Sequence, residues 1–364
     1  MSDSAFGDER DTGAEGPGRG LLAAALGVAV LAGITVVGLA WAKWLPYAGK
    51  VHTLAGTRIW NGSSVLGSGG TSPSLHAAVE FARVYGKAIW KALVVSLLIA
   101  AGLDALVPKR WVVRLLARRS RWGQAAAGGL VSLPSMMCTC CTAPVTVSLR
   151  RAGVPLPAAV AYWLGNPLLN PAVLAFLFLV APWQWAVTRL TVGLVLVVGA
   201  GALLGGFPRS TGRPTPEELL PQDAEVPPRP AQLPGRFLRS LVRLSAVLVP
   251  EYALVVLLIG GFSGWLSQFA SLQAHLGLLA VLVAVLAGTL LVIPTGGEIP
   301  VLLTLAAMGA GSGMVGALLV TLPALSLPSM VMVGRALSPR LTALLAGTVA
   351  AGGVLAAVGL SAIT

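Results

Sequence analysis

The 364-residue chain has few charged residues: Asp, Glu, Lys and Arg make up 10% of it, whereas hydrophobic residues make up 56%. Soluble domains carry about a quarter charged residues, so this composition excludes an ordinary soluble enzyme. The apolar residues also form runs that reach the about 20 residues a helix needs to cross a bilayer. These runs lie near 21–42, 88–107, 158–181, 184–206, 241–262, 274–293, 312–334 and 341–363. The sequence therefore predicts an all-α polytopic membrane protein.

Cysteine is rare: the chain has three, and all of them lie within Cys138-Thr139-Cys140-Cys141. Disulfide scaffolds spread cysteine along the chain, so this clustering excludes such a scaffold. A G-x-x-x-x-G-K-[ST] phosphate loop is also lacking, and the chain itself should not hydrolyse ATP. The net charge is +12, but the basic residues lie at the ends of apolar runs, which argues against nucleic acid as a partner. We expect a lipid bilayer and a small-molecule solute as partners, with no cofactor and no resident metal; homo-oligomer formation is left open.

Polar stretches divide the chain into five parts. Residues 1–20 are rich in Gly and acidic residues and are predicted to form a disordered tail. Residues 21–75 would hold an extra transmembrane helix, followed by a loop from about residue 43. The proline-rich stretch 207–235 would be a cytoplasmic linker. It would separate a first membrane repeat, 76–206, from a second, 236–364.

An internal repeat relates the two halves. Pro144 aligns with Pro300, which is an offset of 156 residues (300 − 144 = 156), and the same offset superimposes three apolar runs. It also pairs Gly153 with Gly309 and Pro167 with Pro323. Self-similarity at a fixed offset indicates duplication of a structural unit.

The basic residues predict the topology. The cluster within 109–121 should be cytoplasmic by the positive-inside rule, as should the linker. Residues 122–149 would then enter from the cytoplasm and return to it, whereas 274–308 would enter from outside. The predicted fold is an inverted repeat of two three-helix halves, each with a re-entrant hairpin, plus an extra N-terminal helix. In the alternative, 274–293 spans the bilayer outright.

Each predicted hairpin tip, 136–144 and 294–300, has a sequence unsuited to continuous helix. Irregular backbone at membrane depth requires protein or a wet cavity to satisfy its polar groups. Pro144 and Pro300 suit the first turn of a following helix, so two helix N-termini would point at the protein centre. We therefore predict a solute site where the tips meet. Besides the cysteines and Pro144, its candidate residues include Thr142, which aligns with Glu298, and the flexible pair Gly296 and Gly297.

The cysteines allow three interpretations. Thiolates are soft ligands that bind soft metal or metalloid ions, Cys138-x-x-Cys141 has the spacing of thiol oxidoreductases, and small residues are also tolerated in packed helices. An extended tip would bring Cys138 and Cys140 to one side, whereas a helical turn would do so for Cys138 and Cys141. All three converge only with an unusual turn. A redox protein with inverted repeats should carry a cysteine in each half, and the second half has none, which favours transport.

Polar side chains inside the apolar runs are further candidates. Glu298 is costly there unless it is functional, so it is either a proton-carrying carboxyl or a hydrogen-bonded structural residue. Glu251 is the second candidate for proton coupling. Asn166 and Asn170 are four residues apart and share a helix face beside Pro167 and Pro171. They either line a polar path for the solute or bond the carbonyls that the prolines free.

The run CTCCTAPVTVSLRRAGVPLPAAVAYWLGNPLLNPAVL, together with the later PTGGEIPVLLTLAAMGAG, resembles the predicted-permease family that includes the organoarsenical efflux (ArsP-type) permeases. The likeness covers about 88–363 and implies a multi-pass permease of the bacterial inner membrane. Some members export trivalent organoarsenicals through motif cysteines, which correspond to Cys138, Cys140 and Cys141. The resemblance thus implies efflux of a soft metalloid or thiol-reactive solute, with proton coupling as an option. A transporter of a sulfur-containing anion and a membrane thiol-disulfide oxidoreductase are the alternatives.

Overall fold

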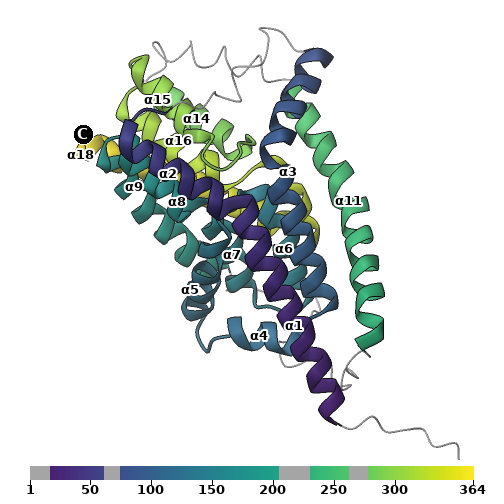
Figure 1. Cartoon of the computed structure of the whole chain (residues 1–364). Helices are drawn as coiled ribbons and strands as arrows, with labels where there is room; N and C mark the ends of the chain where they lie inside the picture. Colours follow the sequence, from purple (N-terminus) through teal and green to yellow (C-terminus); the bar gives the residue numbers. More distant parts are fainter. Residues whose placement is uncertain (1–16, 61–73, 205–229, 262–277) are drawn as a thin grey trace, which may run out of the picture.

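The computed structural model describes residues 17–60, 74–204, 230–261 and 278–364, and every regular element in these ranges is a helix (Figure 1). Six helical stretches are long and apolar enough to cross a membrane, and the bent pair Ser312–Ala324 and Leu327–Ala336 is a seventh candidate. The six are Ala24–Thr57, Leu75–Ala105, Leu156–Val180, Trp183–Leu204, Leu233–Gly261 and Pro339–Ile363. The prediction of an all-α, multi-pass membrane protein is confirmed.

Large apolar side chains lie on the outside of the bundle, and polar ones lie inside it. Leu26, Val37, Leu130, Phe178, Val195, Leu254 and Val358 are among the exposed apolar residues. Soluble monomers rarely expose apolar patches of this extent, whereas a bilayer solvates them. Conversely, Asn166, Arg189 and Glu298 are buried. The polar chemistry of this chain is therefore enclosed by its own helices.

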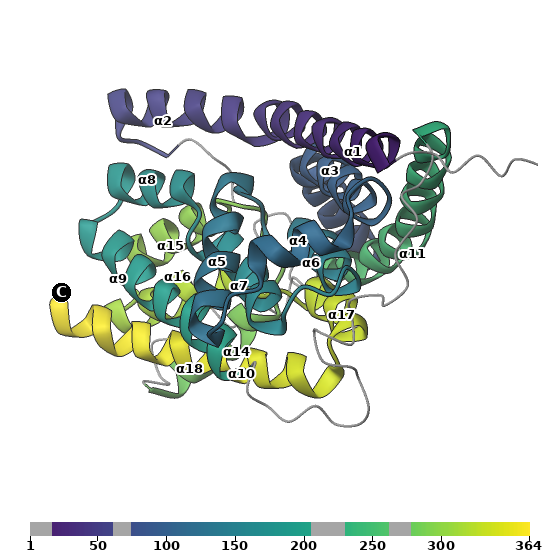
Figure 2. The ribbon, with the colours of Figure 1, turned by 90° about the horizontal axis from the view of Figure 1, so that it is seen from below.

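The N-terminal part forms one long helix along a side of the bundle (Figure 2). It runs from α1 (Pro17–Leu39) through the π-helical turn η1 (Ala40–Trp44) into α2 (Leu45–Thr57). The expected loop from residue 43 is therefore wrong for 45–57, and the expected tail is helical from Pro17. Lys43 lies within this helix, and its side chain is buried against the protein. Residues 61–73 of the expected loop and the tail before residue 17 lie outside the described residues.

The long helices α3 (Leu75–Ala105) and α11 (Leu233–Gly261) pack against each other at one edge of the bundle (Figure 1). The basic helix α4 (Lys109–Leu116) lies at the lower end in this view. The first half continues with α5 (Arg121–Ser132), the 3₁₀ turn η3 (Leu133–Ser135), α6 (Thr139–Arg151), α7 (Leu156–Leu168), α8 (Pro171–Val180), α9 (Trp183–Leu194), the π-helical turn η4 (Val195–Ala200) and α10 (Gly201–Leu204). The second half continues with α14 (Leu278–Leu290), α15 (Glu298–Ala307), α16 (Ser312–Ala324), α17 (Leu327–Ala336) and α18 (Pro339–Ile363).

The helix bounds recur at the offset found in the sequence. α16 begins and ends 156 residues after α7 (312 − 156 and 324 − 168), and α17 does so after α8 (327 − 171 and 336 − 180). α9 and α18 begin at Trp183 and Pro339, and α6 and α15 end at Arg151 and Ala307. The two paired glycines also share a left-handed backbone, with φ 91° at Gly153 and 85° at Gly309. The alignment of the two halves thus holds for local structure as well as for residue type.

Two expected segments differ in detail from the structure. The described part of 274–293 contains α14, a helix of 13 residues. At 1.5 Å per residue this part extends about 20 Å, and the residues directly before Leu278 lie outside the described ranges. Most of the expected linker, 205–229, lies outside the described residues, and its last residues are helical, in η5 (Pro230–Gln232) and the start of α11.

Candidate solute site

A helix break exposes the cysteine motif to the centre of the protein. After η3, Met136 adopts a left-handed conformation (φ 48°), and Cys138 is extended (φ −79°, ψ 166°) as the N-cap of α6. Asn166 holds this break: its Oδ1 accepts hydrogen bonds from Ser135 Oγ at 2.5 Å and from Met137 N at 3.4 Å. Its Nδ2 donates to the carbonyl of Tyr162 at 3.0 Å. Asn166 therefore positions the motif through its Oδ1, while its Nδ2 fixes the amide to its own helix, α7.

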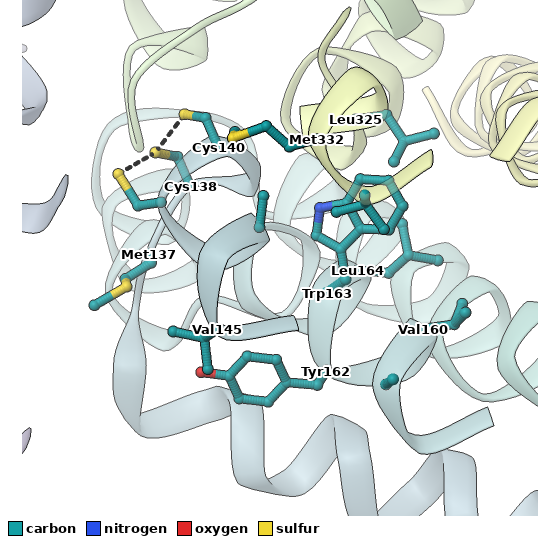
Figure 3. Packing of buried hydrophobic residues seen from close by; sticks show 14 of the residues in the cluster. Met137, Cys138, Cys140, Val145, Val160, Tyr162, Trp163, Leu164, Leu325 and Met332 are labelled. Atoms are coloured by element: carbon teal, nitrogen blue, oxygen red, sulfur yellow. Dashed lines mark hydrogen bonds between the residues drawn. The ribbon is translucent and has the colours of Figure 1, made fainter. Parts of the chain in front are cut away.

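The three cysteine sulfurs converge at this break (Figure 3). Cys138 Sγ lies 3.0 Å from Cys140 Sγ and 3.2 Å from Cys141 Sγ, and the three sulfurs lie within 4.8 Å of one another. All three are free thiols and fully enclosed. The unusual turn on which this convergence depends is the left-handed Met136 followed by the extended Cys138. The group satisfies the geometric requirement for holding one soft atom by several sulfurs.

Two tyrosines lie beside the sulfurs. Tyr85 Oη of α3 is 3.2 Å from Cys140 Sγ, and its ring centroid is 6.2 Å from that of Tyr252 in α11. The Tyr252 hydroxyl is buried and has no hydrogen-bond partner in the part of the chain that the structure describes. Helices α3 and α11 thus place two hydroxyls beside the cysteine cluster. That of Tyr85 contacts a cysteine sulfur, and that of Tyr252 keeps its hydrogen-bonding capacity.

Pro144 in the first tip does not lie where the sequence predicted it. The helix begins at Thr139, so Pro144 lies in the interior of α6 rather than in its first turn. Proline has no N–H, so the carbonyl of Cys140 loses its usual helical donor. The Thr142 hydroxyl, Oγ1, donates to a different carbonyl, that of Thr139, at 2.9 Å. The helix can start earlier than expected because Cys138 caps it from an extended conformation.

The second tip connects α14 to α15 and contains the two candidate glycines. Gly296 has a φ of 81°, which favours glycine, and Gly297 N donates to the Pro294 carbonyl at 2.8 Å. A Cβ on Gly296 would lie 3.8 Å from the Trp60 ring and 3.9 Å from that of Phe176, so aromatic side chains cover this tip. Pro300 lies in the first turn of α15, as expected.

Glu298 forms a buried ion pair with a residue of the first half. Arg189 Nη1 of α9 donates to Glu298 Oε1 at 2.8 Å, and the side chains are 0% and 2% exposed. The same guanidinium donates to the carbonyls of Pro167, at 2.6 Å, and Leu168, at 3.3 Å. The Pro167 carbonyl is free because Pro171, four residues later, has no N–H. Arg189 thus connects the second tip to the break between α7 and α8.

Both broken helices contribute polar groups near α6. Asn170 Oδ1 caps α8 by accepting from Ala172 N at 3.1 Å, whereas its buried Nδ2 has no partner among the described residues. At the break between α16 and α17, where the helices bend by 47°, Ser326 Oγ lies 3.2 Å from Thr139 Oγ1. Helix α17 also packs on α6, and its Met332 belongs to the buried cluster of the cysteines (Figure 3). Among the expected amides, Asn170 is the one with hydrogen-bonding capacity left for a solute.

Among the described residues, Glu251 forms its ion pair with a residue that lies outside both tips. Its Oε2 lies 3.1 Å from Nη1 of the exposed Arg335, near the end of α17. It is an ion-paired carboxylate between α11 and α17 rather than a neighbour of Glu298.

Comparison with known proteins matches residues 74–361 to ArsP_1, a family of predicted permeases. The chain belongs to this family. The UPF0718 protein YraQ of Escherichia coli (strain K12) is 38% identical over 322 residues, which cover 88% of this chain and 91% of that protein. The UPF0718 protein YcgR of Bacillus subtilis (strain 168) is 27% identical over 106 residues, 29% of this chain and 36% of that protein. No solved structure matches the chain.

The ArsP_1 match begins at residue 74 and therefore leaves out the long N-terminal helix, although that helix reaches the site. Trp44 Nε1 donates to the Pro134 carbonyl at 2.7 Å, just before the cysteine motif. Lys43 Nζ donates to Tyr47 Oη at 3.0 Å and to Thr295 Oγ1 of the second tip at 3.4 Å. Its ammonium also lies within electrostatic range of Cys138 and Cys141.

Four residues of this ArsP_1 site were not predicted. Arg189 lies inside the apolar run 184–206, and an arginine at membrane depth is itself a signal that could have identified it. Lys43 follows the run 21–42 directly and was placed in a loop. Tyr85 and Tyr252 gave no signal, because single tyrosines are common in membrane helices.

Proposed function

We propose that this ArsP_1 member is a permease that exports a soft, thiol-reactive solute, such as a trivalent organoarsenical, across the bacterial inner membrane. The observation that carries the proposal is the convergence of three buried free thiols at a helix break. Arsenic(III) is a soft centre that prefers sulfur ligands, and Cys138, Cys140 and Cys141 provide three of them in one place. Efflux as the direction follows from the resemblance to organoarsenical efflux permeases.

The proposed transport mechanism is alternating access between two inverted halves. Equal helix bounds at an offset of 156 residues support the repeat. The inversion is supported by the positions of α5 and its counterpart at this offset, α14, toward opposite ends of the bundle (Figure 1). Such repeats carry the solute between broken helices near the membrane centre while one half moves against the other. The breaks at Asn170 and Ser326 would be the corresponding elements here.

Glu298 is the proposed proton-coupling residue, with Glu251 as the second candidate. The ion pair with Arg189 holds the Glu298 side chain against α9. Uptake of a proton would weaken this pair and release the second tip from α9 and from the break between α7 and α8. Proton binding and movement of the tip would therefore be linked through one contact.

Solute uptake by everted membrane vesicles tests the proposed function. Vesicles from an arsenic-sensitive strain that expresses the chain should accumulate trivalent methylarsenite, whereas vesicles with Cys138, Cys140 and Cys141 all replaced by serine should not. Equal amounts of both proteins in the membranes provide the control. Equal accumulation by both vesicle types would show that the cysteines are packing residues. Consumption of thiols without solute movement would instead support the oxidoreductase alternative.

A further inference from the structure

The buried ammonium of Lys43 has no carboxylate partner among the described residues, and the anion-forming groups within its electrostatic range are the Tyr47 hydroxyl and the thiols that would hold the soft atom. The residue is 7% exposed, and its two hydrogen-bond partners are the uncharged hydroxyls of Tyr47 and Thr295. The ion pairs of the described chain involve other residues. A charge removed from water without a partner is strongly unfavourable, so an anion is expected to complete this environment.

Its position gives Lys43 a role that the neighbouring lysines do not share. Lys50 and Lys91 are less buried and lie against aromatic rings, with Lys50 Nζ 3.4 Å from the centroid of Trp60 and Lys91 Nζ 5.2 Å from that of Trp41. Lys43 also lies over a ring, 5.1 Å from the centroid of Tyr47, but in addition it bonds the second tip through Thr295 and lies within electrostatic range of two cysteines.

The local backbone supports the same conclusion. Lys43 belongs to the π-helical turn η1, and such turns are rare and occur frequently at functional sites. Trp44 anchors this turn to the Pro134 carbonyl, beside the first tip. The turn therefore contacts the second tip and the residue two positions before the first tip, and its ammonium lies within electrostatic range of the cysteines.

We propose that Lys43 is a solute-binding residue and that the site takes soft solutes that carry a negatively charged group. The cysteines bind the soft atom, and the ammonium neutralises the anionic group. This inference rests on the proposed function, because it concerns the same solute, and it adds the charge of that solute. It also makes the N-terminal helix, which the family match leaves out, part of the binding site. A neutral trivalent arsenical satisfies the sulfurs but leaves the lysine without a counter-ion.

Two arsenical probes with the same soft atom test the proposal: neutral phenylarsine oxide and 4-carboxyphenylarsine oxide, which adds a carboxylate. Their binding to the purified full chain in lipid nanodiscs is measured by protection of the three thiols from maleimide. The wild type should bind the carboxylate probe about tenfold more tightly, which corresponds to about 1.4 kcal/mol. Lys43→Met should abolish this preference and leave binding of phenylarsine oxide unchanged, whereas Lys43→Arg should keep it. Lys50→Met is the matched control and should behave as the wild type.

The outcomes separate this proposal from the one on which it rests. Equal affinity of the wild type for the two probes, or a preference that survives Lys43→Met, would overturn the role of Lys43 while the cysteine site stands. Failure of both probes to protect the wild-type thiols would overturn the soft-solute function itself. The comparison of probes on the wild type does not depend on the folding of any variant.

Discussion

Arg189 Nη1 lies 2.8 Å from Glu298 Oε1, and this ion pair joins α9 in the first half to the start of α15 in the second. Both side chains are buried, and the guanidinium also bonds two carbonyls where α7 ends. Removal of one member of a buried pair leaves an uncompensated charge, whereas removal of both does not. This asymmetry determines how the role of Glu298 has to be tested.

Glu298→Gln should abolish pH-driven transport while solute exchange continues, because glutamine keeps the size and hydrogen bonding but does not titrate. The variant also leaves Arg189 unpaired, which can cost about 3–5 kcal/mol of stability. The double variant Arg189→Gln/Glu298→Gln should recover much of that loss and still lack pH-driven transport. Both activities are measured in proteoliposomes with and without a pH gradient. Normal pH-driven transport by the double variant would show that the proton route lies elsewhere, and Glu251→Gln would then be the next variant.

Cys138→Ser should impair solute binding more than Cys140→Ser or Cys141→Ser. Cys138 is the shared member of both short contacts, at 3.0 Å and 3.2 Å, so its loss disrupts every close sulfur pair. Each of the other replacements leaves one pair intact. The measurement is titration with phenylarsine oxide of each purified variant, with thermal unfolding as the control for folding. Equal losses for the three variants would contradict this order.

The two ends of the bundle should be accessible from opposite sides of the membrane. In a chain with all three native cysteines replaced by serine, Arg118→Cys should react with an impermeant maleimide from the cytoplasmic side. Met308→Cys, at the end of α15, should react from the other side. Both native residues are exposed, so accessibility does not limit the test. A cysteine at Ser210, in the expected linker, should react from the same side as Arg118→Cys, and labelling of 118 and 308 from one side would contradict the inverted arrangement.

Gly128→Ala should destabilise the protein, whereas Gly347→Ala should not. A Cβ at Gly128 in α5 would clash with the backbone carbonyl of Ala158 in α7, while one at Gly347 in α18 meets no atom within 4 Å. Overpacking of a helix contact costs about 1–3 kcal/mol, and alanine in an open helical site is neutral or favourable. Thermal unfolding of the purified variants in detergent provides the comparison. A Gly128→Ala protein as stable as the wild type would mean that α5 can move away from α7 without loss.

Much of the architecture was predictable because it depends on local sequence. Apolar runs identified the membrane helices, since each helix satisfies its own backbone and needs only length and hydropathy to span. The break at 294–300 followed from proline and glycine, whereas the first break falls before Thr139 and Pro144 lies inside α6; the offset of 156 residues recurs in the helix bounds. The end of the first helix was predicted less well. The helix continues to Thr57 past the end of the apolar run, and there Lys43 is buried against other helices, which hydropathy along the chain does not report.

Sequence by itself therefore determined that this is a multi-pass membrane protein with a cysteine motif at one of two helix breaks. Only the tertiary structure decided which groups meet there. The sulfurs converge because Met136 adopts a left-handed conformation that Asn166 stabilises from another helix. Glu298 is paired with a residue 109 positions away, and Lys43 reaches a tip 252 positions away. Such contacts are set by how helices pack in three dimensions, and neither composition nor periodicity carries that information.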